Sequence, residues 1–382
     1  MRMDPSSINL FKGVTMAKNY KVAVIGRTGK GAYGHGLDVV WKTIDNIEIV
    51  AVADENEAGR KAAQTRLGAK NAYADYKQML EKEKPQIVSV ADRFLDQHRD
   101  MVIACAENGA SIFLEKPMAT TLQEADEMIT ACERHHVKLA IAHQTRYSPR
   151  MLQIKKMIAD GVLGDILEMH GRGKEDARGG GTDLMVLGTH IFDLMRYFSG
   201  NPITCYSKIR FEGKPATKEN IKDGGEGMGP IIGDNINASY AFENGAFATF
   251  GSHKAKFGSG SRFGLHLYGS KGAVHVATGG LGSAWFLDNP SWSPIKGKVQ
   301  WQEITSEGVG KVEPIKDGGL GMGNTWIVKD LIEAIEKDRQ PLGSAYDGRG
   351  ALEMIMAVYE SFRVGGVVSL PLKNRKHPLT MV

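Results

Sequence analysis

Cysteine is scarce in this sequence, and the few cysteines stand far apart. The 382 residues include three of them, Cys105, Cys132 and Cys205, which do not share a spacing typical of metal ligands. An odd number of distant thiols is typical of reduced cysteines in a cytosolic protein. We therefore expect neither a disulfide framework nor a metal site.

Net charge and long apolar runs are also lacking. Lys and Arg number 48 and Asp and Glu 44, which gives a formal net charge of +4, and no basic run could follow a phosphate backbone. No stretch approaches the roughly 18 apolar residues of a membrane helix, and the N-terminal segment lacks the apolar core of a signal peptide. The sequence predicts a soluble, cytoplasmic protein with no nucleic acid or membrane partner, preceded by a disordered extension over residues 1–19.

The length exceeds a comfortable single core, so we expect two domains of roughly 150 residues or more. Over residues 20–145, short apolar strands alternate with helical patterns, which predicts an α/β Rossmann domain whose parallel sheet is covered on both faces. The predicted strands cover residues 21–25, 47–53, 87–91, 111–114 and 138–142. The predicted helices cover residues 35–43, 57–67, 76–83, 97–108 and 122–135.

The pattern changes after residue 145, and residues 146–382 predict an α+β domain with a large, mainly antiparallel sheet. A sheet with one open face favours a homo-oligomer, either a dimer or a tetramer. Glycine-rich stretches at 224–233, 279–282 and 318–323 predict long loops. The predicted helices cover residues 151–160, 184–198, 325–337 and 347–363. The predicted strands cover residues 203–211, 236–242, 246–253, 263–268 and 273–276, with a last one ending near 372.

A glycine-rich segment follows the first predicted strand. Gly29, Gly31 and Gly34 satisfy the GxGxxG pattern, although this match starts three residues after Gly26, where the usual turn lies. Glycines there let the backbone approach a pyrophosphate, and the following helix N-terminus adds donors. The motif alone is weak, but its place between a strand and a helix predicts a dinucleotide site.

Asp54 ends the second predicted strand, where an acidic side chain would accept hydrogen bonds from both ribose hydroxyls of the dinucleotide. The alternative is that Asp54 is the N-cap of the helix that begins near Glu57. Because Glu55 follows Asp54 and no arginine is adjacent, NAD is favoured over NADP.

Lys116 lies in the sequence Glu115-Lys116-Pro117, directly after an apolar strand. A lysine held at a strand end beside a cationic nicotinamide, and partly removed from water, should lose proton affinity and become a usable base near neutral pH. The alternative is that Lys116 is an ordinary solvated loop lysine.

Together these features resemble the glucose-fructose oxidoreductase and inositol dehydrogenase family (Gfo/Idh/MocA) over about residues 20–372. The resemblance implies a Rossmann domain, a sheet domain used for oligomerisation, and an active site between them. The matching segments are Glu115-Lys116-Pro117-Met118-Ala119-Thr120-Thr121, Gln144-x-Arg146-Tyr147-x-Pro149, Gly179-Gly180-Gly181, Gly188-Thr189-His190-Ile191-Phe192-Asp193-Leu194, Tyr268-Gly269-Ser270-Lys271-Gly272 and Tyr359-Glu360-Ser361.

With the resemblance in place, we expect Lys116 and His190 to be the catalytic residues. The residues expected to bind NAD are Gly26, Thr28, Gly29, Gly31, Gly34, Asp54, His98, Glu115, Lys116 and Gln144. The residues expected to bind a small polyhydroxylated substrate are Lys116, Arg146, Tyr147, Lys174, Asp183 and His190.

One position departs from the family pattern, which has an aspartate four residues before the histidine. Here that position is Val186, so the usual carboxylate cannot orient His190. Asp183 and Asp193 could compensate, although Asp193 matches a family position and more often braces the helix. The alternative for His190 is a buried structural histidine.

These observations favour an NAD-dependent enzyme that oxidises a secondary hydroxyl of a sugar, glycoside or cyclitol to a ketone. A second possibility is an enzyme that retains its NAD and cleaves or rearranges a glycoside through a transient keto-sugar. A third is a non-catalytic NAD-binding protein.

Overall fold

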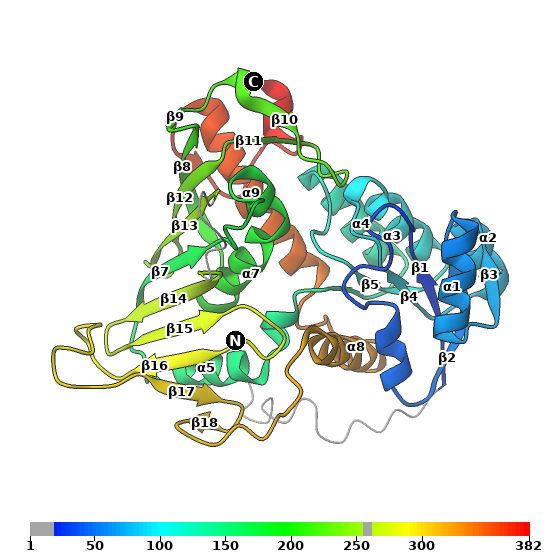
Figure 1. Cartoon of the computed structure of the whole chain (residues 1–382), viewed down its shortest axis with the longest axis horizontal. Coiled ribbons are helices and arrows are strands. Elements are labelled where there is room, and N and C mark those ends of the chain that lie inside the picture. Colours follow the sequence, from blue (N-terminus) through cyan, green and yellow to red (C-terminus); the bar gives the residue numbers. More distant parts are fainter. Residues whose placement is uncertain (1–18, 255–261) are drawn as a thin grey trace.

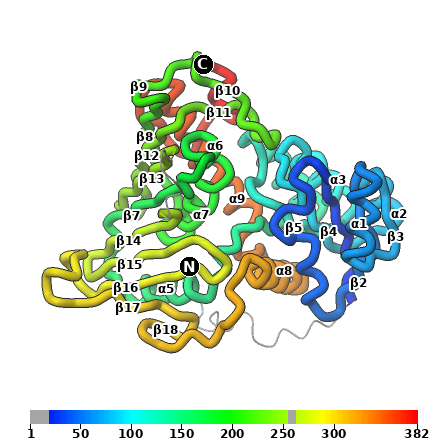
Figure 2. The backbone as a smooth tube through the Cα atoms, in the orientation of Figure 1, coloured from blue at the N-terminus to red at the C-terminus, as the bar shows by residue number. Residues whose placement is uncertain are grey.

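The fold is described from a computed structural model that covers residues 19–254 and 262–382. The disordered extension predicted for residues 1–19 lies outside the described residues, except for Asn19. The two predicted units lie side by side, with the N-terminal one in blue and cyan and the strands of the larger sheet stacked beside it (Figures 1 and 2). Among the described residues, no helix is long and apolar enough to cross a bilayer.

The first unit is a parallel sheet with the strand order β3-β2-β1-β4-β5-β6, as the Rossmann prediction requires. Its central strands are buried along their length because helices cover both faces. The prediction missed β3, which is only three residues long and has no apolar run. The strands are β1 (Tyr20–Ile25), β2 (Ile47–Ala53), β3 (Asn71–Tyr73), β4 (Ile87–Val90), β5 (Ser111–Leu114) and β6 (Leu139–Ile141).

The helices of this unit lie near their predicted positions, with one exception. The prediction of a helix over residues 35–43 is wrong, because only the 3-10 helix η2 (Val39–Thr43) forms there. Gly34 and Gly36 have φ values of +60° and +83°, which a right-handed helix cannot accommodate. The helices are α1 (Glu57–Leu67), α2 (Tyr76–Glu83), η3 (Leu95–Gln97), α3 (His98–Glu107) and α4 (Leu122–Arg134).

A helix from late in the chain completes the first unit. Helix α8 (Leu320–Glu336) packs beside the first sheet (Figure 1), although it lies far beyond the predicted boundary at residue 145. Its buried residues Ile327 and Leu331 share one apolar cluster with Val22 of β1. The chain therefore crosses to the second unit and returns, which ties the two units together at more than one point.

The second unit is a large sheet with the order β18-β17-β16-β15-β14-β7-β13-β12-β8-β19, to which β9 adds at β8. Its pairs are antiparallel except for β13 with β7, so the prediction of a mainly antiparallel sheet is confirmed. The strands are β7 (Ile166–Arg172), β8 (Pro202–Phe211), β9 (Lys214–Pro215), β12 (Asn235–Phe242), β13 (Phe247–His253), β14 (Gly264–Gly269), β15 (Ala273–Ala277), β16 (Ala284–Leu287), β17 (Gln302–Thr305), β18 (Gly308–Val309) and β19 (Val368–Ser369).

Helices cover one face of this sheet. Tyr240 of β12 donates a hydrogen bond to the Met354 carbonyl of α9 (Ala345–Val364) at 2.9 Å. The prediction missed β7, whose alternation is weakened by Gly171, and the structure supplies the reason for that glycine. A Cβ at Gly171 would lie 2.3 Å from Cγ2 of Ile191, so the covering helix requires glycine at this place.

Two predictions in this unit are wrong. The single helix predicted over residues 184–198 is two helices, α6 (Gly181–Val186) and α7 (Gly188–Ser199), because Leu187 has non-helical angles of φ −122° and ψ −35°. The long loop predicted over residues 224–233 contains a short strand, β11 (Pro230–Ile232), paired with β10 (Ile221–Asp223). The remaining elements are η4 (Gln144–Tyr147), α5 (Pro149–Ala159), η5 (Lys218–Asn220) and η6 (Pro378–Met381).

The docking of α8 can be tested by Leu331→Ala. Leu331 is fully buried against the first sheet, so its truncation should lower the free energy of unfolding by about 2–5 kcal/mol. Urea denaturation followed by circular dichroism measures this loss. Lys337→Ala, at the exposed end of the same helix, is the control and should change stability by less than about 1 kcal/mol. Equal effects of the two substitutions would contradict the packing described here.

Candidate functional site

A cavity of about 600 Å³ lies between the two units, within the range typical of ligand pockets. Both units and all three of the glycine-rich stretches contribute to its wall. The first unit supplies His35, Arg93, Lys116, Pro117, Gln144 and Thr145. The second supplies Lys174, Arg178, Thr182, Val186, Leu187, His190 and Phe263, and the loops add Gly224, Glu226, Met228, Thr278, Gly279 and Leu320.

Lys116 projects into this cavity from the end of β5. Only 8% of the residue is exposed, and its Nζ donates a hydrogen bond to the Val186 carbonyl at 3.1 Å. Burial lowers the pKa of the Lys116 ammonium, while the neighbouring Glu115 carboxylate opposes this shift. The alternative of a solvated loop lysine is therefore wrong.

The carbonyl of Val186 is the hydrogen-bond partner of Lys116. Helix α6 ends at Val186, and the break at Leu187 leaves this carbonyl turned to the lysine of the other unit. A backbone carbonyl accepts a hydrogen bond but carries no full charge, so it fixes the amine without stabilising its protonated form as strongly as an aspartate would. The site thus positions Lys116, while burial lowers the pKa of its ammonium.

His190 lies on the first turn of α7 and lines the same cavity. Its ring centroid is 5.4 Å from that of His143 and 6.2 Å from that of Phe263. Burial, followed by the positive charge of Lys116, lowers the pKa of His190 well below its ordinary value. The imidazole is consequently neutral at physiological pH and can both donate and accept a hydrogen bond.

Asp193 does not compensate for Val186 by binding His190. Its carboxylate accepts two hydrogen bonds from Nε of Arg146, at 2.9 and 3.0 Å, and lies 3.4 Å from Nδ1 of His143. The Arg146 guanidinium holds the pKa of Asp193 below its ordinary value despite burial. Asp193 therefore braces α7 against η4, as expected from its place in the sequence.

The buried Glu115 pairs with the partly exposed His35 beside Lys116. Glu115 is fully buried, and its Oε1 lies 2.5 Å from Nδ1 of His35, which lines the cavity. No described residue bonds its second oxygen, Oε2. A buried carboxylate oxygen next to a cavity is suited to accept a hydrogen bond from a ligand.

The glycine loop closes tightly on the end of β4. Gly29, Gly31 and Gly34 all have positive φ, and the loop folds back so that Arg27 and Ala32 form a β-bridge. A Cβ at Gly31 would lie 2.7 Å from the backbone nitrogen of Arg93. Glycine is therefore required at Gly31 by close approach as well as by backbone angle.

Asp54 is surrounded by protein donors. Its carboxylate accepts hydrogen bonds from the backbone nitrogen of Thr28 at 3.1 Å, from the Thr28 hydroxyl at 2.7 Å and from the Tyr33 hydroxyl at 2.9 Å. Asn56, and not Asp54, caps α1 by accepting from Gly59, so the N-cap alternative is wrong. The residue is only 2% exposed, and a ribose would have to displace one of these donors.

His98 is misplaced for the predicted contact with NAD. It is fully buried, with Nδ1 3.1 Å from the Pro117 carbonyl and Nε2 3.0 Å from the Asp92 carbonyl. Both ring nitrogens of His98 are thus within hydrogen-bonding distance of backbone carbonyls. We correct the prediction accordingly, because His98 supports the segment that carries Lys116 and has no surface to offer a ligand.

Arg146 and Tyr147 were predicted to contact the substrate, but they too have structural roles. Nη2 of Arg146 lies 3.1 Å from a carboxylate oxygen of Asp347, in addition to its bonds with Asp193. The Tyr147 hydroxyl donates to Asp330 at 3.1 Å and accepts from the Gly343 nitrogen at 2.7 Å. Both side chains are buried and lie outside the cavity wall, because they join η4 to the late helices.

Asp183 is a further correction among the predicted substrate residues. It is fully buried, and its carboxylate accepts from the backbone nitrogens of Lys174 and Glu175, each at 3.1 Å. The break at Leu187 also removes the continuous helical face that was expected to link Asp183 with His190. Asp183 therefore shapes the loop that presents Lys174 to the cavity.

Gln144 and Lys174 do line the cavity, as predicted. The side chain of Gln144 donates to Asn324 of α8 at 2.9 Å, and Asn324 in turn donates to the His35 carbonyl at 3.0 Å. The prediction missed Arg93, Arg178 and Phe263. Only Arg93 carried a usable signal, since it lies just beyond the end of β4, where parallel sheets bind ligands.

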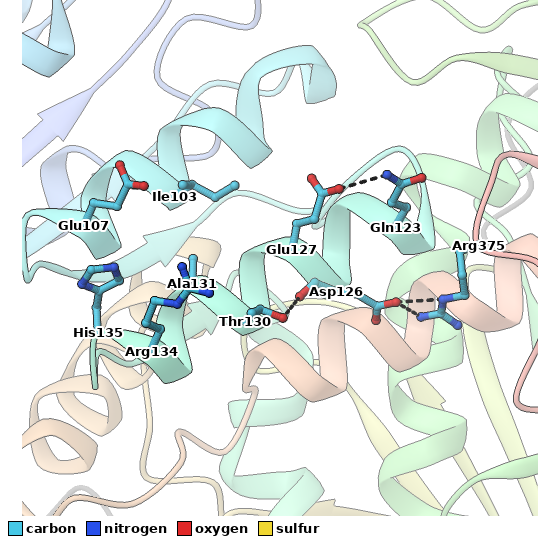
Figure 3. A pocket seen from close by; sticks show the side chains of 10 residues that line it. All are labelled: Ile103, Glu107, Gln123, Asp126, Glu127, Thr130, Ala131, Arg134, His135 and Arg375. Atoms are coloured by element: carbon cyan, nitrogen blue, oxygen red, sulfur yellow. Dashed lines mark hydrogen bonds and ion pairs between the residues drawn. The ribbon is translucent and has the colours of Figure 1, made fainter.

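A second hollow, of about 460 Å³, lies on the outer side of the first unit between α3 and α4 (Figure 3). Asp126 and Arg375 form an ion pair at one end of it, and Gln123 donates to Glu127 at 3.0 Å. None of the predicted catalytic or binding residues lies there. The interdomain cavity is therefore the candidate site.

Comparisons with known proteins match both units of the chain. The family model "Oxidoreductase family, NAD-binding Rossmann fold" matches residues 20–143, and "Oxidoreductase family, C-terminal alpha/beta domain" matches residues 155–370. Levoglucosan dehydrogenase of Pseudarthrobacter phenanthrenivorans is 25% identical over 84% of this chain and 89% of its own. D-apiose dehydrogenase of Paraburkholderia graminis is 32% identical, but over only 39% of each chain.

Myo-inositol 2-dehydrogenase of Thermotoga maritima is 25% identical over 65% of this chain and 74% of its own. Among solved structures, levoglucosan dehydrogenase in complex with NADH and levoglucosan superposes with a TM-score of 0.75. That match covers 93% of this chain and all of the other at 21% identity, so it shows the shared fold.

The residues at the end of the first sheet fit a dinucleotide, with one obstacle. The glycine loop and the unpartnered Glu115 oxygen lie at the carboxyl ends of β1 and β5, where such a ligand binds. However, the ring of Tyr33 fills the space beside Gly26, since a Cβ there would lie 2.2 Å from it. Binding therefore requires Tyr33 to move.

The role of Tyr33 can be tested by Tyr33→Phe. Removing the hydroxyl frees an acceptor site on Asp54, so NADH affinity should rise about fivefold, the equivalent of one hydrogen bond. Titration of NADH fluorescence measures the dissociation constant. Tyr73→Phe, in the same unit but bonded to Glu83, is the control and should leave NADH affinity unchanged. Weaker binding by Tyr33→Phe would show that the hydroxyl instead assists the ligand.

Proposed function

This chain belongs to the Gfo/Idh/MocA oxidoreductase family and carries that family's NAD-binding Rossmann fold, and from this premise we propose that it oxidises a secondary hydroxyl of a sugar, glycoside or cyclitol to a ketone. The observation that carries the proposal is the buried amine of Lys116, held beside His190 in the cavity between the two units. An amine of lowered pKa at this place is suited to remove the proton of a substrate hydroxyl.

Lys116, Val186 and His190 have different roles in this reaction. Lys116 accepts the hydroxyl proton, and its new positive charge offsets the developing alkoxide. The carbonyl of Val186 keeps Nζ in position, and the neutral ring of His190 hydrogen-bonds the substrate and passes the proton onward. Bound NAD supplies the hydride acceptor at its nicotinamide ring.

The named relatives support the substrate class. Levoglucosan dehydrogenase, myo-inositol 2-dehydrogenase and D-apiose dehydrogenase each act, by name, on a sugar, anhydrosugar or cyclitol. The cavity of this chain is lined mostly by polar and charged side chains, which suits a polyhydroxylated ligand. Hydrogen bonds left unmade when a hydroxyl is absent or inverted would give the selectivity.

A retained cofactor is the second candidate function, and one structural feature favours it. Residues 224–229, which we call the strap, cross from the second unit to the first. The Glu226 carbonyl accepts from the Leu95 nitrogen at 3.0 Å, and a Cβ at Gly227 would lie 2.8 Å from the Asp96 nitrogen. A strap over this end of the cavity would slow NAD release, as in an enzyme that cleaves a glycoside through a keto-sugar.

Homo-oligomer formation, as a dimer or tetramer, is also part of the proposal. Helices α7 and α9 cover one face of the large sheet, and the opposite face carries the exposed aromatic side chains of Tyr206 and Phe247. Aromatic side chains are enriched at protein interfaces. These residues support self-association through that face.

The role of Lys116 can be tested by Lys116→Met. Turnover should fall by at least about a hundredfold because the base is lost, while NADH affinity should change little. In the parent enzyme, kcat/KM for oxidation should rise with pH and level off with a midpoint below about 10.4, because the lysine must be neutral and its pKa is lowered. Lys156→Met, an exposed lysine of α5, is the control. Undiminished turnover, or a midpoint at the ordinary lysine value, would contradict this role.

Cofactor exchange separates the two candidate functions. If the enzyme is a dehydrogenase, NADH absorbance at 340 nm, a wavelength characteristic of reduced nicotinamide, should grow over many turnovers when sugar and excess NAD are supplied. If NAD is retained, NADH should not exceed one equivalent per subunit, while the sugar is still converted. Chromatographic analysis of the sugar in the same samples distinguishes the second result from a simple lack of activity.

A further inference from the structure

The charges around the candidate site are unbalanced. Apart from the amine of Lys116, three cationic side chains line the described cavity wall, those of Arg93, Lys174 and Arg178, against the single carboxylate of Glu226. A cleft lined by one sign of charge raises the local concentration of ligands of the opposite sign. This excess of positive charge favours an anionic ligand. Its position in the cavity indicates whether that ligand is the cofactor or the substrate.

Glu226 serves the cofactor side of the cavity. Its carboxylate lies 3.8 Å from Nη2 of Arg93, which follows β4, and its carbonyl accepts from Leu95. Arg93 is packed against the glycine loop, where a dinucleotide diphosphate would lie. Glu226 thus faces Arg93 at the cofactor end, although its charge also reaches Arg178, and a smaller excess of positive charge remains on the second unit.

Lys174 and Arg178 come from the segment between β7 and α6, on the substrate side. Asp183 holds the backbone of this segment through the Lys174 nitrogen at 3.1 Å. Asp176 accepts from Nε of Arg178 at 3.0 Å and lies 3.7 Å from Nζ of Lys174, so one carboxylate faces two cations. Among the described contacts, Nη1 of Arg178 donates to no protein group, and this edge stays available to a ligand.

Lys116 lies close to these charges. The positive charge of Arg178 is one of the causes that lower the pKa of Lys116, so the guanidinium and the amine are close enough to interact electrostatically. Glu115 lies behind Lys116, fully buried and paired with His35, and offsets part of the lysine charge. His190 and His35 are the other titratable groups of the wall, and the neutral imidazole of His190 adds no charge.

We propose that the substrate is an anionic sugar, one that carries a carboxylate or a phosphate group bound by Arg178 and Lys174 while a ring hydroxyl reaches Lys116. An arginine presents paired donors that match a carboxylate or phosphate, and a nearby lysine adds a point charge. This inference rests on the proposed oxidation of a sugar hydroxyl and narrows its substrate class.

Matched pairs of neutral and anionic sugars test the inference. Methyl glucoside is compared with methyl glucuronide, and glucose with glucose 6-phosphate, using the full-length protein and NADH formation to obtain kcat/KM. We expect the anionic member of at least one pair to be favoured by tenfold or more, and the favoured pair identifies carboxylate or phosphate. A neutral member used as well as its anionic partner in both pairs would overturn the inference.

Substitution of the arginine gives the second arm. Arg178→Gln should reduce the preference for the anionic member by tenfold or more, chiefly through KM, since a charge-assisted hydrogen bond is lost. Arg210→Gln is the matched control, because Arg210 is an exposed arginine of β8 outside the cavity wall and should keep the full preference. An unchanged preference in Arg178→Gln would contradict the assigned contact.

Calorimetric binding of the same pairs to the NADH complex requires no turnover. Tighter binding of the anionic member, weakened between 0.05 and 0.5 M NaCl as charge screening demands, would support the inference even if no sugar were oxidised. In that case the proposed oxidation would fail while the substrate class held. If only neutral sugars were oxidised, the proposed oxidation would hold and the proposed anionic substrate would fail. The failure of either proposal can therefore be told from the failure of the other.

Discussion

The hydrogen bond between Nζ of Lys116 and the carbonyl of Val186 is the contact on which the site depends. It links the end of β5 in the first unit to the end of α6 in the second, across the cavity that both units enclose. A buried amine without a partner would be costly, and an amine paired with a carboxylate would stay protonated. A carbonyl satisfies the first requirement and avoids the second, so this bond fixes the position of Lys116 while burial lowers its pKa.

Buried polar groups behind the cavity keep this bond in place. His98 holds the segment after Lys116 through two backbone carbonyls, and the Arg146 and Asp193 pair fixes α7 relative to η4. Tyr147 then joins η4 to α8 through Asp330, so the first unit and the late helices are linked behind the cavity. These side chains are costly to leave unpaired, and their mutual satisfaction makes the arrangement specific.

The sequence predicted the Rossmann sheet, the mainly antiparallel second sheet and the cavity positions of Lys116 and His190, because apolar periodicity and strand ends are local signals. The sequence could not show which residues of a motif contact the ligand and which only pack against other elements. Arg146 and Tyr147 belong to the same matching segment as Gln144, yet only Gln144 reaches the cavity wall. The closing of Tyr33 onto Asp54 and the return of α8 to the first sheet depend on long-range contacts, which no local pattern encodes.

The charges of the cavity wall give a physical explanation for the valine at position 186. A carboxylate there would add a negative charge to the cavity wall, which would raise the pKa of Lys116 and offset part of the positive charge of Arg178 and Lys174. With Val186, the amine is held by a neutral carbonyl, and the positive potential from Arg178 and Lys174 is left for the ligand. That potential also favours the neutral form of Lys116, because a protonated amine would be repelled by Arg178. The absence of a carboxylate at position 186 is thus consistent with both the lowered pKa of Lys116, whose main cause is burial, and the proposed anionic substrate.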